Sequence, residues 1–186
     1  MATKTLSPAL EAAKTRMSTT TGATVGVALS TLAAVANSAA DEAVWLAGDT
    51  CMIPDRETLE SLIFERKFGN GKTYGVLLET TNGDVRQLYF TTLKKNVSVS
   101  DENGKATGER VHSNTEFYKE VMKQPTLAAI FELLASKKSI TVQKVENVVT
   151  AAYREGVIVG SRTTTVPFFV AEERPAEAPK DDSKKK

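Results

Sequence analysis

The stretch TYGVLLETTNGDVRQLYF, residues 73–90, limits what this chain can fold into more than any other feature. An Asn-Gly pair between two runs of β-type residues is a strong signal for a β-hairpin, because both turn residues tolerate positive φ. Apolar residues fall on both faces of this hairpin near one end. The pattern therefore predicts a hairpin that is covered on both sides there, as in a small barrel or sandwich.

A two-residue loop at the Asn-Gly pair fixes the register of the hairpin. It places Glu79 opposite Arg86, and Gly75 opposite Phe90, whose ring would cover the glycine. We expect Leu88 to face the core, so that truncation to alanine costs about 2 to 5 kcal/mol. Arg86 would form an exposed cross-strand pair, and its loss would cost about 1 kcal/mol or less.

The sequence around this hairpin predicts one α+β domain over residues 44–171, mainly antiparallel, with a helix inserted before the last hairpin. The expected elements are an amphipathic helix within residues 54–68, a looser hairpin over 96–113, a helical region over 113–138 interrupted at Pro125, and a final hairpin over 139–170 that turns at Glu155-Gly156. This order resembles that of an OB-fold barrel, a resemblance of fold that carries no function.

The last hairpin carries two further signals. Ile140 and Val142 alternate out of phase with Val145 and Val149, which predicts a β-bulge between the two pairs. Pro167 lacks a backbone donor and therefore indicates an edge strand or a strand end.

Both ends of the chain differ from this domain. Residues 1–43 form an arm rich in Ala, Thr and Ser, uncharged from 17 to 40. It is interpreted as mobile or as a weak helical stripe that docks onto a partner, with a secretory signal cleaved near Ala34-Val35-Ala36 or a membrane span as the alternatives. Residues 172–186 contain Pro, Ala and charge but no large apolar residue, which predicts a disordered tail.

Composition and motifs give catalysis no support. The 24 Lys and Arg balance 23 Asp and Glu, so no overall field attracts nucleic acid or a membrane. Cys51 and His112 are single, which excludes an intramolecular disulfide and a zinc cluster. The run GNGKT at 69–73 resembles the end of a phosphate-binding loop, but Arg66 stands where that motif needs glycine. We expect no enzyme, metal or cofactor.

A nucleic-acid surface is the alternative hypothesis, because base stacking needs aromatics beside basic residues. The candidate contacts are Tyr74, Arg86, Tyr89, Lys94, Lys95, Arg154 and Arg162.

Three stretches resemble small uncharacterised proteins of gut bacteria and their tailed phages: WLAGD with the following Ile53-Pro54, LYFTTLKKNVSVSDENGKATGE, and ITVQKVENVVTAAY. The resemblance implies no activity and no functional residues. It favours a non-enzymatic binding or assembly module, such as a phage structural or accessory subunit that docks through its N-terminal arm. Such a protein would be cytoplasmic or virion-associated, and its partner would be another protein or further copies of itself.

Overall fold

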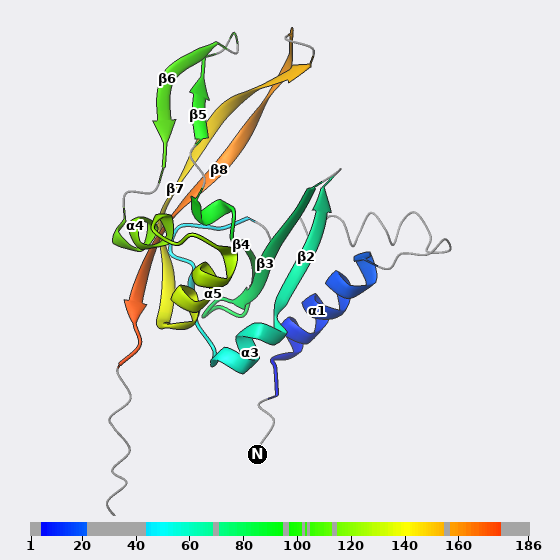
Figure 1. Ribbon diagram of the computed structural model, residues 1–186. Helices are drawn as coiled ribbons and strands as arrows, with labels where there is room; N and C mark the ends of the chain where they lie inside the picture. The colour runs from blue at the N-terminus through cyan, green and yellow to red at the C-terminus, as the bar shows by residue number, and fades with distance from the viewer. Residues whose placement is uncertain are drawn as a thin grey trace, which may run out of the picture.

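Four α-helices, one short 3₁₀ helix and eight strands make up the part of the chain that the computed structural model describes, residues 5–21, 44–68, 71–94, 97–101, 103, 105–112, 115–154 and 157–175 (Figure 1). The helices are α1 (Pro8–Thr21), α3 (Arg56–Ser61), α4 (Glu116–Met122) and α5 (Leu127–Ala135), with η1 at Thr92–Lys94. The strands are β1 (Thr50–Met52), β2 (Ile63–Phe68), β3 (Gly71–Glu79), β4 (Val85–Tyr89), β5 (Val97–Ser100), β6 (Ala106–Val111), β7 (Lys137–Arg154) and β8 (Val157–Glu173).

The strands form three antiparallel sheets, with the orders β1-β7-β8, β2-β3-β4 and β5-β6. The prediction of an α+β fold with antiparallel strands is therefore confirmed. Within the described residues no sheet closes into a barrel. The first two sheets, with α1, α3, α4 and α5, share one hydrophobic cluster, which we call the main core.

The β3–β4 hairpin forms where the sequence predicts it, but its register is shifted by one residue. Gly83 donates its N–H to the Thr80 carbonyl at 2.9 Å, and Thr80 donates to the Asp84 carbonyl at 2.7 Å. Three residues therefore form the loop, and Gly83 takes the positive φ of 88° that such a loop needs. Arg86 consequently lies opposite Leu78, and the predicted pairing with Glu79 is wrong.

Both faces of this hairpin are covered, as predicted. Val76, Leu77 and Leu78 are all buried, and Leu88 is fully buried in the main core. An aromatic ring does cover Gly75, but it comes from Phe64 on β2 and not from Phe90. The close fit explains the glycine, because a Cβ there would lie 2.6 Å from the Phe64 ring.

The helix predicted within residues 54–68 is shorter than expected. Asp55 caps α3 by accepting the Thr58 N–H at 3.0 Å, and the helix ends at Ser61. The remaining residues form β2, which pairs with β3 along its whole length. Helical periodicity does account for the burial of Leu59 and Leu62, but the strand pairing of Phe64 with Gly75 overrides it beyond that point.

Helix α1 lies before the predicted start of the domain and packs against the main core. The predicted domain began at Val44, whereas Leu10 and Ala13 of α1 are buried in the main core beside β3 and β4. Residues 22–43, which contain the predicted stripe and cleavage site, lie outside the described residues. At the other end β8 continues to Glu173, past the predicted boundary at 171, and residues 176–186 lie outside the described residues.

Four further predictions of secondary structure are confirmed. α4 and α5 flank Pro125, and Thr126 caps α5 by accepting the Ala129 N–H at 3.1 Å. The looser hairpin is β5–β6. A register shift between Val142 and Lys144 is the predicted bulge, and Pro167 lies in β8, an edge strand of its sheet.

Candidate interaction site

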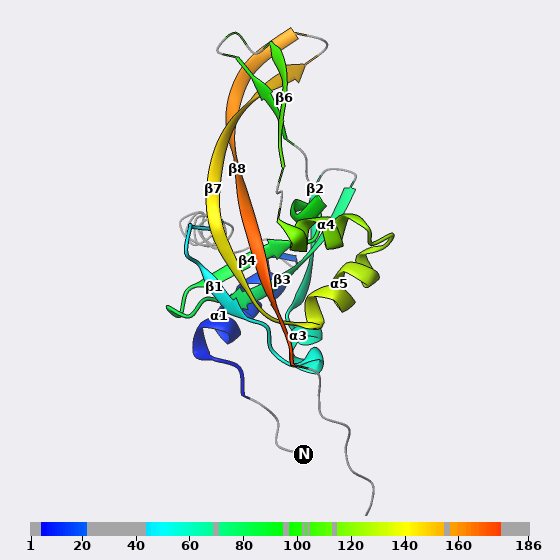
Figure 2. The same cartoon turned by 90° about the vertical axis from the view of Figure 1, so that its left-hand side faces the viewer.

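The longest elements of the protein, β7 and β8, form a hairpin that extends past the rest of the fold. They contain 18 and 17 residues, and at the usual rise per residue each spans about 60 Å. Their paired bases lie beside α3, α4 and α5, and both views show the other end standing clear of the helices and of β2, β3 and β4 (Figures 1 and 2). We call residues 146–154 and 157–166 the projecting hairpin.

The base of this hairpin is held by ion pairs. Lys137, whose side chain is almost fully buried, donates to Glu120 at 2.7 Å and also pairs with Glu173. Burial alone would lower the pKa of Lys137, but the hydrogen bonds to the two carboxylates outweigh it and the pKa is raised. Arg174 donates from Nη2 to the Ile53 carbonyl at 3.0 Å, which ties the end of β8 to the segment before α3.

A second, smaller core covers one face of the projecting hairpin. Val148 of β7 and Val166 and Phe168 of β8 pack against Val97 of β5, so the β5–β6 hairpin lies along this face (Figures 1 and 2). The Lys144 ammonium lies 4.3 Å from the centroid of the Phe168 ring and extends the cluster toward the main core.

The opposite face and the far end carry exposed apolar and β-branched side chains. Val149 is 40% exposed, and Val157 and Val159, close to the turn, are 65% and 63% exposed. Thr163 and Thr165 on β8 are exposed as well. Val157 and Val159 are two residues apart in sequence, and neighbouring exposed aliphatic side chains are typical of a protein-interaction surface.

An apolar cavity of about 330 Å³ lies at the other end of the molecule. Its walls come from α1, β1, α3 and the end of β3, through Leu10, Met52, Leu62 and Leu78, with Glu79 among the lining residues. Met52 is 52% exposed. The cavity is therefore an apolar depression with a flexible thioether side chain and a carboxylate in its wall.

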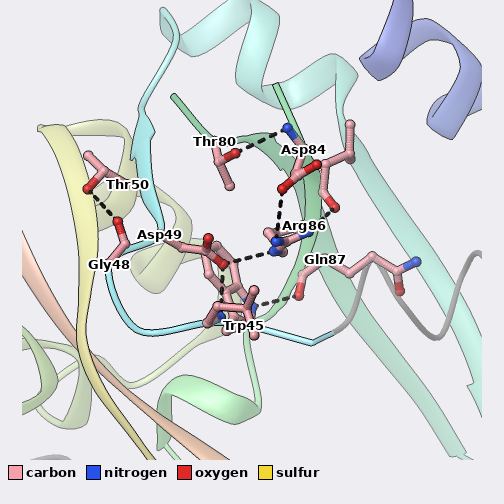
Figure 3. A network of polar contacts seen from close by, with 10 residues as sticks. Trp45, Gly48, Asp49, Thr50, Thr80, Asp84, Arg86 and Gln87 are labelled. Atoms are coloured by element: carbon pink, nitrogen blue, oxygen red, sulfur yellow. Dashed lines mark hydrogen bonds and ion pairs between the residues drawn. The ribbon is translucent and has the colours of Figure 1, made fainter. Parts of the chain in front are cut away.

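Between these two ends lies a buried polar network (Figure 3). Arg86 donates from Nε to Asp49 Oδ2 at 2.8 Å, and the two side chains are only 9% and 6% exposed. The same carboxylate oxygen accepts the Leu46 N–H at 2.9 Å. Trp45 donates from its indole to the Gln87 carbonyl at 3.1 Å, so the network joins β4 to the segment that leads into β1. Its contacts are internal to the fold.

Cys51 lies beside this network and is fully buried. Burial, together with the Asp49 carboxylate, raises the pKa of the thiol from 9.0 to about 12. A thiol with so high a pKa is a poor nucleophile at neutral pH.

The residues predicted to contact nucleic acid, so far as the structure describes them, belong to different parts of the fold. Arg86 is buried in the ion pair with Asp49. The Tyr89 hydroxyl donates to Gln87 Oε1 at 2.6 Å and accepts from Arg66 at 2.7 Å. These two residues are thus engaged inside the fold rather than aligned along a groove.

The other candidates lie in separate places. Tyr74 is half-buried and packs against the main core. Lys94, in η1, donates to the Gln124 carbonyl. Arg154 and Arg162 belong to the strands of the projecting hairpin, well away from β4, and Lys95 lies outside the described residues.

Within the described ranges, no three His, Cys, Asp or Glu side chains are grouped closely enough to hold a metal ion. His112 is half-buried, with its ring 6.1 Å from that of Tyr118. None of the described helices is long and apolar enough to cross a membrane. Comparisons with family models, with curated proteins and with solved structures find no match to this chain.

The cavity and the buried ion pair of Asp49 with Arg86 were not predicted from the sequence. The cavity joins four elements that are distant in sequence, and no local pattern points to it. The ion pair did leave a signal, because Asp49 is a lone acid between the apolar residues of VWLAGDTCMIP. A lone acid in an apolar segment suggests a buried partner, which the shifted register of β4 supplies.

Proposed function

We propose that the protein is a non-enzymatic assembly module that joins further copies of itself through the projecting hairpin, as a structural or accessory subunit of a larger particle does. The observation that carries this proposal is the exposure of Val149, Val157 and Val159 on an element that extends beyond the body. The tailed-phage particle suggested by the sequence is one setting in which such a subunit works.

The projecting hairpin is a ribbon of only two strands, because β1 pairs with β7 only at residues 139–141. A two-stranded ribbon is marginally stable in water unless a third strand or a packed face supports it. β5–β6 supports one face, through the second core, and leaves Val149 on the face that nothing in the described residues covers. A neighbouring subunit would cover it, and each fully buried valine would contribute about 1.5 to 3 kcal/mol.

The N-terminal arm remains a second predicted docking segment. Its uncharged stretch lies outside the described residues, so the proposal rests on the hairpin alone. The nucleic-acid alternative has less support, because Arg86 and Tyr89 make internal contacts. That alternative assumed an OB-like barrel, and no sheet closes into a barrel within the described residues.

Sedimentation velocity over a concentration series tests the proposal. The wild-type protein should associate as its concentration rises, and the double variant Val157→Asp/Val159→Asp should remain monomeric because two charges replace the apolar contacts. Val170→Asp is the matched control, since Val170 lies on the same strand, is 42% exposed and sits near the base of the hairpin. A double variant that associates like the wild type, or a wild type that stays monomeric throughout, would contradict the proposal.

A further inference from the structure

We infer that the buried ion pair of Asp49 with Arg86 selects the register of the β3–β4 hairpin, because a second register is open to β4 and the pair excludes it. In the second register a two-residue loop at Asn82-Gly83 places Arg86 opposite Glu79 instead of Leu78. Removal of the pair therefore lets part of the population slip by one residue. The proposed assembly function does not depend on this choice of register, because the β3–β4 hairpin packs in the main core and not in the projecting hairpin.

The two strands of this hairpin differ in how firmly the rest of the fold holds them. β3 pairs with β2 over residues 71–76, and just beyond its other end Thr81 donates its N–H to the Thr50 carbonyl at 2.8 Å. β4 is the last strand of its sheet, and among the described residues β3 is the only strand that pairs with it. β4 can therefore slide along β3 without breaking the pairing of any other strand.

The turn itself favours neither register strongly. Gly83 has a φ of 88°, which the three-residue loop needs, and a two-residue loop at Asn82-Gly83 needs a positive φ at this glycine as well. The observed loop is closed by the Thr80 N–H, which donates to the Asp84 carbonyl at 2.7 Å. A two-residue loop closes with backbone hydrogen bonds of the same kind, so the choice of register comes from contacts outside the turn.

Apolar burial does not decide the register either, because both faces of β3 are covered. Val76 and Leu78 on one face and Leu77 on the other are at most 1% exposed. A slip of one residue turns every side chain of β4 to the opposite face. Leu88 would then lie opposite Leu77 instead of Val76, against a buried aliphatic side chain in both registers.

The ion pair does distinguish the two registers, because Asp49 is held by a strand outside the hairpin. Val142 of β7 accepts the Gly48 N–H and donates its own N–H to the Asp49 carbonyl, both at 2.8 Å. The carboxylate is thus a fixed point, which Arg86 Nε reaches at 2.8 Å in the observed register (Figure 3). A slip would move Arg86 by about 3.4 Å along the strand and turn its side chain to the opposite face. Asp49 would then be buried without a counter-charge, which disfavours the second register by roughly 100-fold or more.

Two smaller contacts act on the same choice. The Trp45 indole donates to the Gln87 carbonyl at 3.1 Å and supports the observed register, but a hydrogen bond between neutral groups contributes less than a buried unpaired charge costs. The second register offers Arg86 a contact with the half-buried Glu79. That contact balances the charge of Arg86 but leaves Asp49 without a partner, so the second register becomes populated only when the Asp49 charge is removed.

NMR of the isotope-labelled full-length protein tests the inference, because NOEs between backbone protons of directly opposite residues report the register. The wild type should show one set of hairpin signals, with Arg86 opposite Leu78. Asp49→Asn keeps the shape of the side chain and removes its charge. It should show a second set from about a tenth or more of the molecules, with Arg86 opposite Glu79. Adding Glu79→Gln to this variant should reduce the second set, because it weakens the contact that stabilises the second register.

Asp84→Asn is the matched control, because Asp84 also contacts Arg86, at 3.3 Å, but its side chain is 61% exposed. It should show the wild-type register alone. The inference is overturned if Asp49→Asn is folded and shows the wild-type register alone, or if Asp84→Asn gives as large a second set.

If Asp49→Asn does not fold, Asp49→Asn/Arg86→Gln takes its place, because it removes both charges of the pair and leaves neither one buried without its partner. Its register is read at Leu88, which lies opposite Val76 in the observed register and opposite Leu77 in the second. Both sets of signals should be present, and the first set alone would overturn the inference.

Discussion

Replacing Asp49 with alanine should destabilise the protein strongly, because it leaves the Arg86 guanidinium buried without its counter-charge. The Arg86 side chain is 9% exposed, and its Nε lies 2.8 Å from Asp49 Oδ2. Removing one partner of a buried ion pair typically costs about 3 to 5 kcal/mol, whereas the intact pair itself adds little net stability. For a chain of this length the loss corresponds to a fall in melting temperature of about 6 to 20 °C.

A neighbouring ion pair provides the control. Arg86 also contacts Asp84 through Nη2 at 3.3 Å, but the Asp84 side chain is 61% exposed. Asp84→Ala should therefore cost about 1 kcal/mol or less. The double variant Asp49→Leu/Arg86→Leu removes both buried charges, and it should recover much of the stability that Asp49→Ala loses.

Urea denaturation of the four proteins measures these differences, with the change in midpoint at constant slope reporting the free energy of unfolding. The prediction is wrong if Asp49→Ala and Asp84→Ala lower the free energy of unfolding by the same small amount, because Arg86 would then be solvated in both variants. It also fails if Asp49→Leu/Arg86→Leu is less stable than Asp49→Ala. Arg86→Ala, measured in the same way, separates this buried pair from the exposed pair expected from the sequence, for which the loss of Arg86 would be nearly neutral.

Four other measurements test the main core, the fit around Gly75, the buried thiol of Cys51 and the nucleic-acid alternative. Leu88→Ala should cost about 2 to 5 kcal/mol by urea denaturation, since Leu88 is fully buried, and an unchanged midpoint would refute its place in the core. Gly75→Ala should lower the melting temperature, because the new Cβ would lie 2.6 Å from Phe64 and 2.9 Å from the Leu88 carbonyl; a neutral result would mean that the ring moves aside freely. The raised pKa of Cys51 means that the unfolded chain releases this proton first as the pH rises above 9. The wild type should therefore lose about 1.4 kcal/mol relative to Cys51→Ala between pH 8 and pH 10, and a constant difference between the two would exclude the shift. Fluorescence titration with single-stranded oligonucleotides at low salt should show no binding, and binding that weakens as salt is added would restore the nucleic-acid alternative.

Much of the fold was predictable because the deciding interactions are local in sequence. The Asn-Gly turn, the helices around Pro125 and the last hairpin depend on turn chemistry, capping and alternation, which a sequence displays directly. The register of β3–β4 was not predictable in this way. Thr80 and Asp84 pair across a three-residue loop, and the sequence does not distinguish that loop from a two-residue one.

This one-residue shift in register determines which residues Arg86 contacts. In an antiparallel pair a slip of one residue changes every cross-strand partner. Arg86 therefore lies opposite Leu78 and not Glu79, and it forms its ion pair with Asp49, which immediately precedes β1. Asp49 is 37 residues away in sequence, and only tertiary structure brings it to Arg86. The same holds for β2, where a helical pattern of leucines gives way to pairing with β3.

The bulge in β7 explains why the projecting hairpin has one covered face and one open face. Before the bulge Ile140 and Val142 point into the main core, and after it Val145 packs there instead, whereas Val148 belongs to the second core. On β8 the adjacent residues Phe169 and Phe168 point to opposite faces, so that Phe169 enters the main core and Phe168 the second core. The two cores therefore lie on opposite faces of one ribbon, one near its base and the other farther out.

Beyond the body, the face that served the main core has nothing left to pack against. Val149 continues the series begun by Val145, and it is 40% exposed because the strands have passed the end of the sheet and helices beneath them. A strand that needed only to complete the main core would end near Val145, the last residue of β7 that packs against that core. Both strands continue instead, with β-branched residues on the open face and valines at the far end, and the proposed contact with a neighbouring subunit would use this surface.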